Sequence, residues 1–260
     1  MRKALVAANW KMNGRRSANE QLISALVSGA EQAGAGVVDI VVCPPAVYLA
    51  DVRQRLAGSL IELGAQNVSS EKADGAYTGE CSAQMFQDAG CSWVLIGHSE
   101  RRARYGETEE VVAAKLLAAL DAGLNPVLCV GETLEQRQAG KLVEVVSSQV
   151  VSALSTLSVD ALSKVVVAYE PVWAIGTGLT ASPDQAQEVH AMIRAVVAEF
   201  AGKDSAQKMR ILYGGSVNAT NAESIFAQPD IDGGLVGGAS LKAEEFLAIC
   251  RASADLAAVG

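Results

Sequence analysis

The stretch Lys164-Val165-Val166-Val167-Ala168-Tyr169-Glu170-Pro171 is an apolar run that ends in one carboxylate. The run predicts a short strand with both faces buried, and Pro171 ends the strand pairing because proline has no backbone N–H. The segment 173–180 contains two glycines and could fold over the carboxylate as a lid. A carboxylate enclosed in this way loses water, so its basicity rises. Glu170 is therefore a candidate general base, although a glutamate in an ordinary surface loop would look the same.

Similar apolar runs recur along the whole chain. The eight runs are Ala4–Ala8, Val37–Val42, Ile61–Ala65, Trp93–Ile96, Pro126–Val130, Val165–Tyr169, Arg210–Tyr213 and Gly234–Val236. Most of the segments between them have helical spacing of apolar residues. Continuous apolar strands indicate a parallel sheet covered by helices on both faces. A length of 260 residues allows two domains or one large α/β barrel, and eight strand–helix units favour closure. We therefore expect a single (β/α)8 barrel domain over residues 1–260.

Two segments carry helix-start signals. Ser17-Ala18-Asn19-Glu20 predicts a capping box, and Ser182-Pro183-Asp184-Gln185 combines a cap, a first-turn proline and a box partner.

Composition excludes several classes of function. The formal net charge of -8 and the scattered basic residues argue against a nucleic-acid partner, which would require a basic stripe. The five cysteines form no CxxC pair and no zinc pattern, so reduced thiols and no bound metal are expected. The apolar stretch after Lys3 ends at Asn9, which is too short for a signal peptide or a membrane span. We expect a soluble cytoplasmic protein.

Unusual residues follow five of the eight runs. They are Asn9-Trp10-Lys11, Gly97-His98-Ser99-Glu100, Glu170, Gly214-Gly215-Ser216 and Gly237-Gly238. In a barrel these positions gather at the carboxyl ends of the strands, where active sites lie. Side chains alternate along a strand, so Asn9 and Lys11 should point into one site and Trp10 away from it.

The two glycine segments suggest an anion site. Both follow the last two strands and lead into helix-like sequence, where exposed backbone amides can bind phosphate without basic side chains. A Gly-Gly pair alone also fits a tight turn.

The two histidines differ in their surroundings. His190 lies in an amphipathic segment and is expected to be a packing or surface residue. His98 ends a buried run and precedes a short predicted helix, whose start disfavours a protonated imidazole. A neutral His98 could donate a hydrogen bond to a carbonyl oxygen, and the alternative is a structural histidine.

Taken together, Asn9-Trp10-Lys11-Met12-Asn13, the His98 segment, the Glu170 segment and the two glycine segments closely resemble the triosephosphate isomerase family. The resemblance runs from the first strand to nearly the last helix. It implies a TIM barrel that interconverts dihydroxyacetone phosphate and glyceraldehyde 3-phosphate through an enediolate, in glycolysis and gluconeogenesis, without cofactor or metal.

The resemblance also implies a role for each site residue. Glu170 moves the proton, His98 polarises the carbonyl oxygen, and Lys11 and Asn9 stabilise the enediolate. Glu100 lies near Lys11. Backbone amides of Gly176, Ser216, Gly237 and Gly238 hold the substrate phosphate.

The resemblance leaves several points open. Leu179 stands where the family usually has lysine, which suggests an altered rate of lid opening. The long polar loop between Gln66 and Ser82 implies a homodimer in which Thr78 approaches the partner's site, although a surface loop would look the same. Another phosphate-binding barrel enzyme, such as an epimerase or aldolase, and a noncatalytic metabolite-binding protein remain alternatives.

Overall fold

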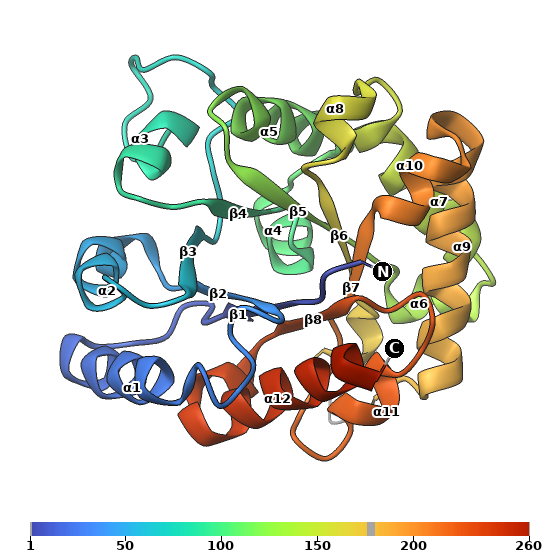
Figure 1. The fold of residues 1–260 in the computed structure, drawn as a ribbon. Helices are drawn as coiled ribbons and strands as arrows, with labels where there is room; N and C mark the ends of the chain where they lie inside the picture. Colours follow the sequence, from blue (N-terminus) through green and yellow to red (C-terminus); the bar gives the residue numbers. More distant parts are fainter. Residues whose placement is uncertain (1, 176–179, 260) are drawn as a thin grey trace.

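The computed structural model describes residues 2–175 and 180–259. Eight parallel strands form a closed barrel in the order β1 to β8, with β8 pairing back to β1 (Figure 1). The strands are β1 (Leu5–Asn9), β2 (Asp39–Cys43), β3 (Ile61–Ala65), β4 (Trp93–Ile96), β5 (Asn125–Val130), β6 (Val166–Tyr169), β7 (Arg210–Tyr213) and β8 (Gly233–Val236). The predicted barrel is confirmed, and each predicted run lies within one or two residues of a strand.

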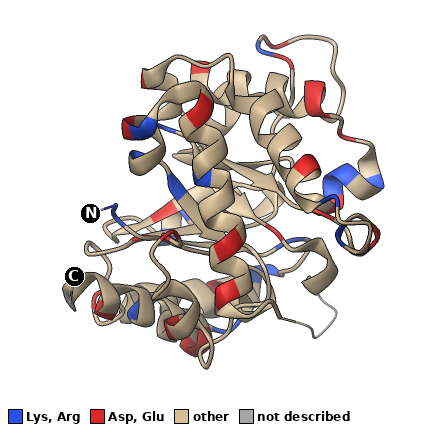
Figure 2. Ribbon diagram, turned by 90° about the vertical axis from the view of Figure 1, so that its right-hand side faces the viewer, with Lys and Arg blue, Asp and Glu red and all other residues tan. Residues whose placement is uncertain are grey.

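Helices surround the barrel, and α12 lies beside α1 and α11 (Figure 1). The α-helices are α1 (Arg16–Gly29), α2 (Leu49–Arg55), α3 (Ala83–Asp88), α4 (Ser99–Tyr105), α5 (Glu109–Asp121), α6 (Leu134–Gln138), α7 (Leu142–Leu154), α8 (Val159–Leu162), α9 (Pro183–Ala201), α10 (Lys203–Lys208), α11 (Ala222–Phe226) and α12 (Ala243–Val259). Short 3-10 turns are η1 (Ala46–Tyr48), η2 (Val172–Ala174) and η3 (Gly238–Leu241). Figure 2 shows lysine and arginine residues interspersed with acidic residues over the helices and loops.

The strands are buried on both faces, as the continuous apolar runs predict. In β1, Leu5 and Ala7 belong to the cluster inside the barrel, whereas Val6 and Ala8 pack against the outer helices. Beyond the strand, Trp10 is fully buried in the outer cluster, although it also lines part of the central pocket together with Asn9 and Lys11. Lys11 departs from the strand alternation, because its backbone is left-handed with φ of 52°.

The two predicted helix starts have different outcomes. The capping box before α9 is confirmed, since Ser182 and Gln185 exchange hydrogen bonds with each other's backbone. The box at Ser17 is wrong, because α1 begins at Arg16 and Ser17 lies inside its first turn. The box partner Glu20 instead pairs with Arg55 of α2 at 2.9 Å. The Glu20 carboxylate, which the local pattern assigned to the helix cap, therefore forms an ion pair with another helix.

Candidate active site

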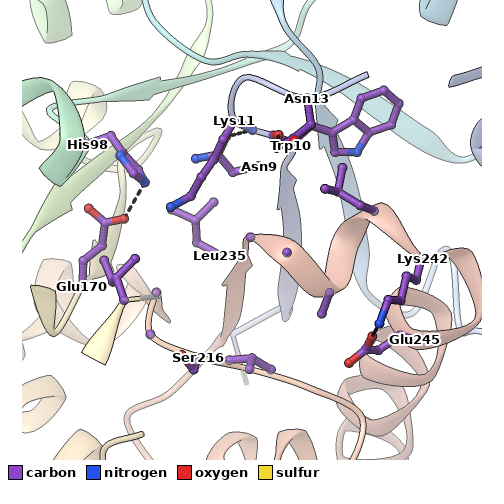
Figure 3. Close-up of a pocket in the computed structure, with 18 residues that line it drawn as sticks. Asn9, Trp10, Lys11, Asn13, His98, Glu170, Ser216, Leu235, Lys242 and Glu245 are labelled. Carbon is purple, nitrogen blue, oxygen red and sulfur yellow. Dashed lines mark hydrogen bonds and ion pairs between the residues drawn. The ribbon is translucent and has the colours of Figure 1, made fainter. Parts of the chain in front are cut away.

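The predicted site residues meet in one pocket at the carboxyl ends of the strands (Figure 3). The cavity has a volume of about 420 Å³, and its lining includes Asn9, Lys11, His98, Glu170, Ser216, Gly237 and Gly238. These residues come from five different strand ends, so closure of the barrel is what brings them together. Gly176 and Leu179, for which the sequence predicts a phosphate contact and a hinge effect, lie outside the described residues.

Glu170 stands at the end of β6 and is 2% exposed. Its backbone N–H donates to the carbonyl of Val130 at 2.7 Å, which continues the β5–β6 pairing by one residue. A Cβ at Gly131 would lie 1.8 Å from the carbonyl oxygen of Glu170, and a Cβ at Gly214 would lie 2.9 Å from its Cγ. Only glycine allows the neighbouring chain to approach this closely. The backbone of Glu170 is therefore packed closely between Gly131 and Gly214, which fixes the position of the carboxylate.

His98 contacts Glu170 directly on one side of the pocket (Figure 3). Its Nε2 lies 2.9 Å from Oε1 of Glu170, while the Ser99 backbone N–H donates to Oε2 at 2.9 Å. His98 also caps helix α4, because its Nδ1 accepts the Glu100 backbone N–H at 3.3 Å. An acceptor Nδ1 carries no proton, so we infer that the ring proton is on Nε2 and that this N–H donates a hydrogen bond to the Glu170 carboxylate.

The pKa values of this pair differ in direction from the sequence-based expectation. Burial raises the pKa of Glu170, but the contact with His98 and the Ser99 amide outweigh it and hold the pKa below its ordinary value. Burial lowers the pKa of His98, but the Glu170 carboxylate raises it above the ordinary value. Enclosure acts in the expected direction, because burial is the largest single influence and raises the pKa of Glu170, but the hydrogen-bonding partners reverse the net shift.

Lys11 is the one non-glycine residue with a left-handed backbone in the described part of the chain, with φ of 52°. This conformation is unfavourable for a side chain such as lysine. The Asn9 side-chain oxygen accepts the Lys11 backbone N–H at 2.9 Å, and the Gln66 amide donates to the Lys11 carbonyl at 2.8 Å. The Lys11 ammonium lies 2.7 Å from a Glu100 carboxylate oxygen. Three neighbours therefore hold Lys11 in the pocket.

Bare backbone lines another part of the pocket, beside Lys11, because a Cβ at Gly237 would lie 3.5 Å from Lys11 Cε. A Cβ at Gly238 would meet no atom within 4 Å, so this backbone is open to the cavity. The Ser216 hydroxyl donates a hydrogen bond to the Ala174 carbonyl at 3.0 Å. Ser216 also lines the cavity. An anion could bind here to main-chain donors.

The family profile for triosephosphate isomerase matches residues 4–253. The chain belongs to the triosephosphate isomerase family. It is 52% identical over 255 residues to the triosephosphate isomerase of Hydrogenovibrio crunogenus, covering 98% of this chain and 100% of that protein. It is 55% identical over 253 residues to the triosephosphate isomerase of Pseudomonas aeruginosa, covering 97% of this chain and 99% of the relative. It is 53% identical over 253 residues to the triosephosphate isomerase of Herminiimonas arsenicoxydans, covering 97% of this chain and 100% of that protein.

A buried polar cluster around Glu132 was missed by sequence reasoning. Glu132 is fully buried and accepts hydrogen bonds from the Tyr169 hydroxyl at 3.1 Å and the Trp173 indole at 2.9 Å. Arg137 pairs with Glu132 at 2.9 Å, and its guanidinium lies 4.7 Å from the centre of the Trp173 ring. The cluster thus ties η2 to the loop after β5.

The signal for this cluster was present in the sequence. Gly131-Glu132 follows β5, and Gln66 follows β3, so the strand-end rule that selects Asn9 and Glu170 also selects these residues.

His190 is fully buried, which confirms the expectation of a packing residue. Its ring makes an edge-on contact with Tyr169, with ring centres 5.9 Å apart. Burial lowers the pKa of His190 to about 3. Within the described residues no group of three histidine, cysteine or acidic side chains could hold a metal ion. No described helix is long and apolar enough to cross a membrane.

Proposed function

We propose that this chain interconverts dihydroxyacetone phosphate and D-glyceraldehyde 3-phosphate by proton transfer through an enediolate. The observation that carries the proposal is one pocket in which Glu170 and His98 are in direct contact near Lys11 (Figure 3), with the bare backbone of Gly237 next to the Lys11 side chain. The relatives at 52% and 55% identity carry the name of this activity. The reaction is a step of glycolysis and gluconeogenesis, which we place in the cytoplasm. The five cysteines are free thiols, as is usual in a reducing compartment.

Glu170 is the base. It takes a proton from the carbon next to the substrate carbonyl and returns it to the neighbouring carbon. To do so, its carboxylate must exchange the His98 and Ser99 hydrogen bonds for the substrate. These two contacts lower the pKa of Glu170, and burial remains when they are lost. The carboxylate therefore becomes a stronger base as it turns toward the substrate.

His98 is the electrophile. Its Nε2 proton, released from Glu170, is directed at the substrate carbonyl oxygen, and it can be exchanged with that oxygen as the enediolate forms. Loss of the carboxylate contact also removes the influence that raises the pKa of His98. Burial and the Lys11 charge then favour the neutral ring, which is the form that the mechanism requires.

Lys11 and Asn9 stabilise the negative charge of the enediolate, and the backbone of Ser216, Gly237 and Gly238 binds the phosphate. The Asn9 oxygen is occupied by the Lys11 backbone N–H, which leaves the Asn9 amide N–H groups for the substrate. This mechanism assigns no step to a cofactor or a metal.

We also propose a homodimer through the loop around Thr78. Large apolar side chains on this side of the molecule are exposed, including Met12 at 95%, Tyr105 at 69% and Tyr77 at 46%. A second cavity lined by Met12, Tyr105 and Cys81 opens beside Lys11 and His98. A partner loop would cover this surface. Sedimentation that shows a fully active monomer would contradict the dimer.

The proposed activity is tested by a coupled assay with glyceraldehyde 3-phosphate, in which the dihydroxyacetone phosphate formed is reduced with NADH. We expect turnover that is insensitive to metal chelators and to borohydride trapping. Loss of activity with a chelator would indicate a metal-dependent epimerase or aldolase, and borohydride inactivation would indicate a Schiff-base lysine. No turnover at all would indicate a noncatalytic binding protein.

A further inference from the structure

An arginine close to the active site has no step in the proposed mechanism. Arg102 lies in α4, the helix that His98 caps, and its side chain is 14% exposed. Its Nε donates a hydrogen bond to the Gly97 carbonyl at 2.7 Å, and its Nη2 donates to the Cys129 carbonyl at 3.2 Å. Gly97 follows β4, and Cys129 lies near the end of β5, which is the neighbouring strand. One side chain therefore joins the carboxyl ends of β4 and β5.

Each of the two carbonyls belongs to a residue next to the backbone of the active site. Gly97 directly precedes His98 in the chain. Cys129 directly precedes Val130, whose carbonyl accepts the Glu170 backbone N–H at 2.7 Å. The guanidinium is therefore connected through short backbone segments to both members of the histidine–glutamate pair.

The pairing of β4 with β5 stops short of these carbonyls. Its register ends with Ile96 beside Leu128, directly before Gly97 and Cys129. Buried backbone carbonyls need hydrogen-bond donors, and beyond the end of the register the Arg102 guanidinium supplies them. A Cβ at Gly97 would lie 3.0 Å from Arg102 Nη2, so glycine allows this close approach. Arg102 thus continues the link between the two strands where their own register has ended.

The third contact of Arg102 explains why an arginine suits this position. Its Nη1 donates to a Glu109 carboxylate oxygen at 2.6 Å, at the start of α5. The planar fork of guanidinium donors can serve two carbonyls and one carboxylate at the same time. A lysine has a single nitrogen on a shorter side chain and cannot reach all three acceptors. Arg102 is not among the described residues that line the pocket, so it acts on the reaction through the backbone.

We propose that Arg102 is a positioning residue, which sets the distance between His98 and Glu170 by joining the strand ends that hold them. The inference rests on the proposed function, since it concerns the same pair of residues. The His98 Nε2 and the Glu170 Oε1 lie 2.9 Å apart, and a misplacement of about 1 Å in reacting groups costs on the order of 100-fold in rate. Loss of the link should slow proton transfer. It should leave phosphate binding intact, because the backbone of Gly237 and Gly238 follows β8, which pairs with neither β4 nor β5.

The test measures kcat and KM for glyceraldehyde 3-phosphate and the inhibition constant of inorganic phosphate. The first variant is Arg102→Lys, which keeps the charge and loses the fork of donors. The second is Glu109→Ala, which removes the anchor and keeps the guanidinium. The Glu109 side chain is 31% exposed, so this variant should fold even if the lysine variant does not.

Arg194→Lys is the matched control. Arg194 also donates to two backbone carbonyls, those of Ala206 and Met209, and pairs with a carboxylate, that of Asp230. These contacts lie at the amino end of the barrel, because Met209 directly precedes β7. The control therefore loses the same kind of structural link far from the active site.

We expect Arg102→Lys to lower kcat on the order of tenfold or more, and Glu109→Ala to lower it about threefold. In both variants KM and the phosphate inhibition constant should stay within about threefold of the unmodified enzyme. Arg194→Lys should lower thermal stability and leave kcat within about 1.5-fold. In the Glu170→Asp background, where the carboxylate is already withdrawn, Arg102→Lys should lower kcat by less than about twofold, because two changes that act on one contact are not additive.

A purely structural role for Arg102 predicts different results. A smaller folded fraction would lower kcat by the same factor in the Glu170→Asp background as in the unmodified enzyme, and that result would overturn the inference. An equal loss of kcat in Arg194→Lys, or a loss confined to KM, would overturn it as well. So would an unchanged kcat in folded Arg102→Lys or, if that variant does not fold, in Glu109→Ala. All of these results leave the isomerase proposal intact, whereas an unmodified chain that does not isomerise triose phosphates would refute the proposed function.

Discussion

Replacing Glu170 by aspartate should lower kcat about 100-fold while substrate affinity changes little. The substitution keeps a carboxylate in the same pocket and shortens its reach by one methylene, about 1.5 Å. The Glu170 oxygens lie 2.9 Å from both His98 Nε2 and the Ser99 nitrogen. After shortening, these separations grow to roughly 4 Å, which is beyond hydrogen-bonding distance.

The backbone cannot move to compensate for the shorter side chain. The Glu170 N–H is bonded to Val130 at 2.7 Å, and Gly131 and Gly214 pack directly against residue 170. A displacement of about 1 Å in a reacting group costs on the order of 100-fold in rate. That factor corresponds to about 2.7 kcal/mol of activation free energy. The phosphate-binding backbone is not touched, so KM should stay within about threefold.

The assay is the NADH-coupled conversion of glyceraldehyde 3-phosphate, with kcat and KM determined separately. Glu170→Gln is the matched control, because it keeps the length and the packing but removes the base, and it should lose more activity than the aspartate variant. Thermal denaturation should show both variants folded. A kcat for Glu170→Asp within threefold of the unmodified enzyme would refute the assignment of Glu170 as a closely positioned base.

Three further changes probe separate parts of the structure. Lys11→Ala should raise KM and lower kcat, so that kcat/KM falls by about 100-fold or more, because in the proposed mechanism one ammonium stabilises both the phosphate and the enediolate. If only thermal stability changed, Lys11 would have a structural role. His190 is neutral when folded, with a pKa of about 3, and takes up a proton near pH 6.5 when unfolded, so stability is complete above pH 6.5 and falls as the pH drops. By pH 5 this loss amounts to about 2 kcal/mol, and denaturant titrations of His190→Gln should lack that share of the acid dependence. Asp232→Asn should cost about 2 kcal/mol of unfolding free energy, because Arg2 and Arg194 each lose a charged partner at the amino end of β8 while Arg194 keeps its ion pair with Asp230 at 2.6 Å, and an unchanged kcat would show that the active site is not involved.

The arrangement of strands was predictable from the chain because burial on both faces leaves a direct pattern. Val165–Tyr169 and Trp93–Ile96 are short, continuously apolar and separated by helical segments, which is typical of parallel sheets covered by helices on both faces, and the recurrence of eight such runs favours closure into a barrel. The same rule placed Asn9 and Glu170 at strand ends facing one pocket. Trp10 is buried in the outer cluster, as alternation along β1 predicts, but Trp10 also lines part of the pocket, and the left-handed backbone of Lys11 does not follow from alternation.

Contacts between distant segments were not predictable. The sequence at Ser17 fits a capping box, but in the structure Ser17 lies inside α1 and Glu20 forms an ion pair with Arg55 of another helix. Glu132 was overlooked because its meaning depends on Tyr169 and Trp173, which lie about 40 residues further along the chain. The left-handed backbone of Lys11 depends on Gln66, 55 residues away. None of these contacts can be recognised from the periodicity of the nearby sequence.

By itself, the sequence determined which residues form strands, which ends carry reactive side chains and which way those side chains point, because periodicity and turn chemistry are local properties. Only the tertiary structure decided that Glu170 and His98 meet at 2.9 Å and that their contact reverses the direction in which burial alone would shift the pKa of each. The distance between two strand ends is set by closure and register of the whole barrel. Electrostatic interactions depend on that distance.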